Sequence, residues 1–140
     1  MINTPERLTP QQALICAMLL MAATGGHVDD VELAQMTRLV QDLPAFAELT
    51  PDQVALSTEI CLPLLADTNG LDVAFDLIRE ALPARLRETA YLLACEVAAA
   101  DGEVTEEELQ MLHQLRLGLE LDRLIAGAIE RAARARYQVI

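Results

Sequence analysis

Apolar residues fill long stretches of the chain, and no stretch alternates apolar and polar positions with the period of two that a β-strand needs. The longest apolar run, 13–23 (ALICAMLLMAA), has no polar face, which is typical of a helix enclosed by other helices. It is too short to cross a bilayer, which takes about 20 residues, so we expect no insertion into a membrane. The pattern therefore predicts an all-α fold with this run at its core.

Capping residues and prolines mark where the helices begin and end. Thr9-Pro10-Gln11-Gln12 and Thr50-Pro51-Asp52-Gln53 each offer an N-cap threonine, a proline at the first helical position and a glutamine that can return the hydrogen bond. Similar signals, among them a kink or an end at Pro63, divide the chain into about seven helices. We expect them at about 10–24, 30–43, 51–63, 71–82, 84–100, 106–117 and 122–136.

Part of the sequence occurs twice. Residues 22–39 align with residues 98–115, with seven identical pairs among eighteen. The repetition predicts a single domain over 1–140 with an internal duplication and pseudo-twofold symmetry. We divide it into a first repeat at about 10–43, linking helices at about 50–82, a second repeat at about 84–118 and a C-terminal helix at about 122–136.

The repeated turn has a structural explanation and a chemical one. With Thr105 as N-cap, Glu108 completes a capping box, and Asp29 and Glu32 fill the same positions in the first copy. The string from Asp101 to Glu108 also resembles the second half of an EF-hand loop. However, the earlier ligand positions of such a loop are apolar here, so we expect no EF-hand.

The two acidic turns could lie together if the two copies pack against each other. Their carboxylates would then form one negative surface, which suits either a hard cation or a basic partner, or is simply solvated. The candidate metal ligands are Asp29, Glu32, Asp101 and Glu108. The candidate partner-binding residues are Asp30, Glu103, Glu106 and Glu107.

Charge and composition narrow the function. The net charge of -12, from 22 acidic and 10 basic residues, repels nucleic acids and anionic membranes. Every basic residue is an arginine, and Ser57 is the only serine, in a context unlike a nucleophile elbow, so we expect no enzyme. The three cysteines lie far apart in apolar runs, which predicts reduced core residues of a cytosolic protein: Cys16, Cys61 and Cys95.

Four charged residues near the second half of the chain have more than one interpretation. Glu96 is a lone acid in an apolar run, and we expect it to face solvent or to meet an arginine, or else to be buried and functional. Arg131, Arg134 and Arg136 follow in the last helix, where positive charge suits a helix C-terminus. They could instead dock onto the acidic turns of a second copy and make a homodimer.

The doubled turn on an acidic, all-helical chain resembles the TerB-like family of tellurite resistance proteins, and Leu92–Leu112 carries the resemblance best. Asp101, Gly102 and Glu108 match the family motif, whereas Gly25 stands where the first copy should have an aspartate. The resemblance implies a TerB-like helical bundle that is cytoplasmic and non-enzymatic. It implies an accessory or scaffold role in stress response, with protein partners in a membrane-associated complex and a divalent cation as the candidate cofactor. The alternative is a metal-independent helical adaptor for protein-protein interactions, whose acidic surface or apolar groove receives a partner helix.

Overall fold

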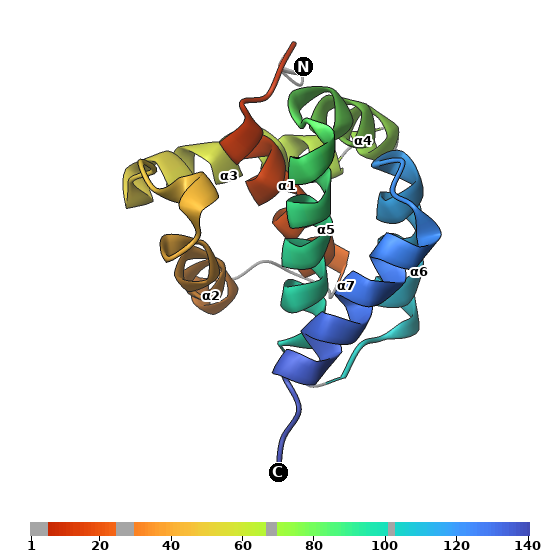
Figure 1. Ribbon diagram of the computed structural model, residues 1–140. Helices are drawn as coiled ribbons and strands as arrows, with labels where there is room; N and C mark the ends of the chain where they lie inside the picture. Colours follow the sequence, from red (N-terminus) through yellow and green to blue (C-terminus); the bar gives the residue numbers. More distant parts are fainter. Residues whose placement is uncertain (1–5, 25–29, 67–69, 101–102) are drawn as a thin grey trace.

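The computed structural model describes residues 6–24, 30–66, 70–100 and 103–140, except for the side chains of Val31, Glu32 and Gln35 (Figure 1). Over these residues the protein consists of seven α-helices and one 3-10 turn, with no strand, so the predicted all-α fold is confirmed. The helices are α1 (Pro10–Thr24), α2 (Asp30–Gln41), α3 (Pro51–Ala66), α4 (Gly70–Ala81), α5 (Ala84–Ala99), α6 (Glu106–Gly118) and α7 (Arg123–Arg136). The 3-10 turn, η1, spans Pro44–Phe46. None of the described helices has the length and apolar character needed to cross a membrane.

Helix α1 is the centre of the bundle. All residues from Ala13 to Ala22 are buried, as the run without a polar face predicts. The helix packs most extensively against α5 and α3 and also contacts α4 and α6 (Figure 1). Each large apolar side chain that is buried in this way contributes roughly 1.5–3 kcal/mol. The close packing of α1 on α5 agrees with the expected contact between the two repeats, although their pseudo-twofold relation stays a prediction.

The capping boxes predicted at Thr9 and Thr50 form. The backbone N–H of Thr9 donates to Oε1 of Gln12 at 2.9 Å, and the N–H of Gln12 donates to Oγ1 of Thr9 at 3.1 Å. Thr50 and Gln53 repeat this arrangement with distances of 2.9 and 3.2 Å at the start of α3. Each box satisfies helix-terminal N–H groups that would otherwise lack a partner, and removal of an N-cap typically costs about 1 kcal/mol.

Helix α3 does not end at Pro63, which was one of the two outcomes expected there. The helix continues to Ala66 with the proline inside it. Pro63 has no N–H to donate to the carbonyl of Glu59, but both residues are exposed, so water can satisfy that carbonyl. The three residues after Pro63 therefore remain helical.

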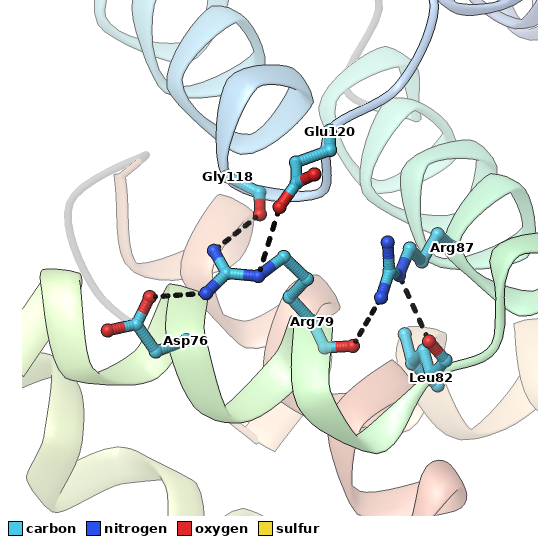
Figure 2. A network of polar contacts seen from close by, with 6 residues as sticks. All are labelled: Asp76, Arg79, Leu82, Arg87, Gly118 and Glu120. Atoms are coloured by element: carbon cyan, nitrogen blue, oxygen red, sulfur yellow. Dashed lines mark hydrogen bonds and ion pairs between the residues drawn. The ribbon is translucent and has the colours of Figure 1, made fainter.

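An arginine network joins the end of α4 to the turn after α6 (Figure 2). The Arg79 guanidinium donates to the carbonyl of Gly118 at 3.3 Å and pairs with Asp76 at 3.0 Å and with Glu120 at 3.3 Å. Glu120 has a φ of 57°, in the left-handed region, so the turn that follows α6 is a tight one. At Gly118 a Cβ would lie 3.1 Å from Cβ of Phe75, so the absence of a side chain allows α6 to approach α4 closely.

A second arginine closes the corner between α4 and α5. Nε of Arg87 donates to the carbonyl of Leu82 at 3.0 Å, and Nη2 donates to the carbonyl of Arg79 at 3.1 Å (Figure 2). Both carbonyls lie at the C-terminal end of α4, where the regular hydrogen-bond pattern of the helix ends, and the carbonyl of Arg79 also accepts from the N–H of Leu82 at 3.3 Å. The arginine therefore provides hydrogen bonds that the helix itself cannot, each worth about 1.5–3 kcal/mol when the donor is charged.

Candidate functional site

The predicted metal ligands are only partly within the described structure. Asp29 and Asp101 lie outside the described residues, as does the side chain of Glu32. In Figure 1, α2 and α6, which carry Glu32 and Glu108, lie on opposite sides of α5. Across the described residues, no three His, Cys, Asp or Glu side chains are grouped as a metal ion would require. The composite cation site stays a prediction.

Glu108 has the structural role that the capping box predicts. It is the third residue of α6 and is only 5% exposed. Its Oε1 atom accepts hydrogen bonds from the backbone N–H and from the hydroxyl of Thr105, each at 3.1 Å. In return, Oγ1 of Thr105 accepts from the N–H of Glu108 at 3.1 Å. One oxygen of the Glu108 carboxylate therefore caps the N-terminus of α6.

The candidate partner-binding acids are all exposed. Glu106 and Glu107 lie in the first turn of α6, Glu103 precedes it, and Asp30 is the first residue of α2. Carboxylates in the first turn also interact favourably with the helix dipole. Their exposure leaves their charge accessible, and the binding of a basic partner stays a prediction.

A hollow of about 640 Å³ lies between α2 and α5, and we call it the α2–α5 hollow. It is also bordered by the last turn of α1, by Glu108 of α6 and by the end of α7. Its lining is mainly apolar and includes Met21, Met36, Leu39, Leu92, Leu93 and Val97. A hollow of this size and character is typical of sites that receive a ligand or a partner's side chains.

Two buried carboxylates line the α2–α5 hollow, those of Glu96 and Glu108. Glu96 is only 8% exposed, so the expectation that it faces solvent is wrong, whereas the expected arginine is present. Nε of Arg136 lies 3.2 Å from Oε1 of Glu96, and the Arg136 guanidinium lies 5.9 Å from the ring of Tyr137. The pair joins residues far apart in the sequence, and no motif or spacing could have predicted it.

A polar contact that has no signal in the sequence joins α5 to α7. The hydroxyl of the buried Tyr91 donates to Oε1 of Glu130 at 2.9 Å. Burial, reinforced by the hydrogen bond to Glu130, raises the pKa of Tyr91 well above its usual range. Burial also raises the pKa of the nearby Cys95 thiol to about 12, with further contributions from Glu130 and Glu96. Tyr91 and Cys95 therefore stay neutral in the folded protein.

All three cysteines are buried and free, as predicted. Cys16 of α1 and Cys61 of α3 interact, and this contact together with burial raises the pKa of the Cys16 thiol. The Cys61 thiol also lies 3.7 Å from the carbonyl oxygen of Gln12. Because the thiolate is the nucleophilic form, Cys16 and Cys95 are poorly suited to chemistry near neutral pH.

These raised pKa values predict a loss of stability at alkaline pH. In the unfolded chain Cys95 ionises from about pH 9, whereas in the folded protein its pKa is about 12. Its contribution to stability is therefore complete below pH 9 and is lost as the pH rises towards 12. We expect the free energy of unfolding, measured with urea from pH 6 to pH 11, to fall above pH 9. The free energy of unfolding of Cys95→Ala should fall less steeply, so that by pH 11 it has lost about 3 kcal/mol less than the wild type, and it should run parallel to the wild type below pH 8. Identical slopes for the two proteins would contradict this account.

The chain matches the model of a known protein family. The family model described as "Tellurite resistance protein TerB" matches residues 11–130. No curated protein and no solved structure matches the chain significantly. The matched region spans every helix from α1 to α6 and half of α7, including both repeated turns and most of the α2–α5 hollow. Since it covers most of the 140 residues, the chain belongs to the tellurite resistance protein TerB family.

Proposed function

We propose that this TerB-family protein is a non-enzymatic accessory protein that binds a helix of a partner protein in the α2–α5 hollow. The observation that carries the proposal is a mainly apolar hollow between two helices, in a chain with a net charge of -12. We further propose that it acts in the cytoplasm, within a membrane-associated stress-response complex, as resemblance to tellurite resistance proteins implies.

The shape and lining of the hollow favour a helix as its occupant. Two helices, α2 and α5, border it along their lengths, with Met36 and Leu39 on one side and Leu93 and Val97 on the other. The members of these pairs are three and four residues apart, about one helical turn, so each pair lies on one face of its helix. An amphipathic helix can lay its own apolar face between such walls, with anchors at positions i, i+3 or i+4 and i+7.

The charge around the hollow favours a basic polar face on that helix. The lining includes three acids, Asp42, Glu96 and Glu108, and two arginines, Arg38 and Arg136. Glu106 and Glu107 are exposed in the turn that leads to Glu108. With a net charge of -12, the protein attracts a basic partner and repels an acidic one. The same charges make the rate of association sensitive to salt.

Photo-crosslinking tests whether the hollow is the binding surface. We would place p-benzoylphenylalanine at Leu39, which lines the hollow, or at Val73, an exposed residue of α4 that does not. In the native host, the protein with the crosslinker at position 39 should give a discrete crosslinked partner whose attached peptide is a basic amphipathic helix. The protein with the crosslinker at position 73 should not. That peptide, made synthetically, should bind the protein at least about tenfold more weakly after Leu39→Glu, because the new charge would be buried against apolar groups. Calorimetry measures the affinity.

The matched variant Val73→Glu adds the same charge outside the hollow and should leave the affinity unchanged. Equal crosslinking from both positions, or equal affinities of both glutamate variants, would show that the partner binds elsewhere. Crosslinking of Leu39 to a small molecule alone would show that the occupant is not a protein.

We propose separately that the acidic turns hold a divalent cation through Asp29, Glu32, Asp101 and Glu108. Support comes from the exposed carboxylates beside Glu108, since hard cations prefer carboxylate oxygen.

Calcium, magnesium, manganese or zinc at millimolar concentration should raise the melting temperature to a plateau, because a ligand that binds the folded state stabilises it. The amide resonances of Asp101 and Glu108 should shift with the same saturation. Asp101→Asn should abolish the effect, whereas Asp72→Asn, at an exposed acid of α4, should retain it. A response that does not saturate, or that survives Asp101→Asn, would exclude this site.

A further inference from the structure

Glu96 is a buried carboxylate on an otherwise apolar part of α5. Its neighbours Leu93, Ala94 and Cys95 are buried as well, and Glu96 itself is 8% exposed. A carboxylate in such surroundings has lost most of its hydration and needs a positive charge beside it. In the described part of the chain, the ion pair with Arg136 supplies that charge.

Arg136 is held loosely compared with the acid that it neutralises. It is the last residue of α7, and its side chain is 65% exposed while that of Glu96 is 10% exposed. An exposed guanidinium regains its hydration when it leaves, and ion pairs with one exposed member contribute little to stability. Another cation that enters the hollow can therefore replace Arg136, and Glu96 keeps a positive partner throughout the exchange.

The carboxylate of Glu108 lines the same hollow and adds to its preference for a cation. The Oε1 atom of Glu108 accepts hydrogen bonds from Thr105, whereas its Oε2 atom takes part in no hydrogen bond or ion pair with the residues that the structure describes. Two carboxylates with little access to water favour a positive group over a neutral or negative one. A guanidinium suits such a place because its planar array of N–H groups can donate to more than one carboxylate oxygen.

We infer that Glu96 and Glu108 form a built-in site for the arginine or lysine side chain of an incoming helix, and that Arg136 occupies this site until that side chain displaces it. Met21, Leu92 and Val97 line the hollow with the two acids and would contact the apolar part of the helix. The identity of the ligand rests on the proposed function, because it deepens the description of the partner helix. The site itself can be tested without the partner.

Octylguanidinium, which joins one guanidinium to an apolar chain, is a suitable probe for the full-length protein. Its binding would be measured by calorimetry below its micelle concentration, with octanol as the uncharged control. We expect octylguanidinium to bind at least about tenfold more tightly than octanol, and Glu96→Gln to remove that difference. Arg136→Gln should tighten binding by roughly fivefold, because the internal competitor is gone.

Arg134→Gln is the matched control, since it removes the same charge from an exposed arginine in the same last turn of α7. It should leave the affinity for octylguanidinium within about twofold of the wild type. If Arg136→Gln binds no more tightly than Arg134→Gln, Arg136 is not a competitor, and the inference fails. That comparison decides the matter even if Glu96→Gln does not fold. If the inference fails but the binding of the partner helix still depends on Leu39, the proposed function remains supported.

Discussion

The need to enclose α1 on every side is the constraint on which the rest of the structure depends. An amphipathic helix can lie on the surface of a protein, but a helix that is apolar all round must be surrounded. Helices α3, α4, α5 and α6 together provide that enclosure, with α5 and α3 in the most extensive contact (Figure 1). The arginines at the ends of α4 and α5 then hold the enclosing helices to one another by hydrogen bonds to helix-terminal carbonyls.

Helix α2 takes little part in this enclosure, and the hollow is a consequence. Among the described residues it makes no extensive backbone contact with another helix, although Met36 and Val40 are buried. Met36 and Val40 belong to the hydrophobic core, whereas Met36 and Leu39 also line a space shared with α5. The proposed partner helix would enter this space. The buried charge of Glu96 gives the space chemical selectivity that an apolar hollow alone would lack.

Local sequence signals predicted most of the fold because they act between residues close together in the chain. The threonine caps at Thr9, Thr50 and Thr105 define helix starts through contacts three residues apart, and the apolar run of α1 determines what must be buried. At Pro63 the sequence left a kink and an end both open, because the groups that can satisfy the freed carbonyl depend on tertiary packing.

The candidate site was less predictable, because it depends on contacts between distant parts of the chain. The sequence singled out Glu96 and Arg136 separately, but it could not show that α7 returns across α5 and brings them together. It likewise gave no signal for the hydrogen bond between Tyr91 and Glu130. The repeated sequence pointed to the acidic turns as the candidate site. The hollow instead arises from the way α2 packs, and no local sequence motif encodes that packing.

Native-state hydrogen exchange tests the central claim most directly, because it measures the free energy of opening at each amide. If enclosure of α1 holds the protein together, the amides of Leu19 in α1 and Ala94 in α5 should exchange only through global unfolding. Their opening free energies should then equal the free energy of unfolding measured with urea, while the amide of Leu39 in α2 should open at a clearly lower cost. Exchange of Leu19 at the same free energy as Leu39, or below it, would contradict the account.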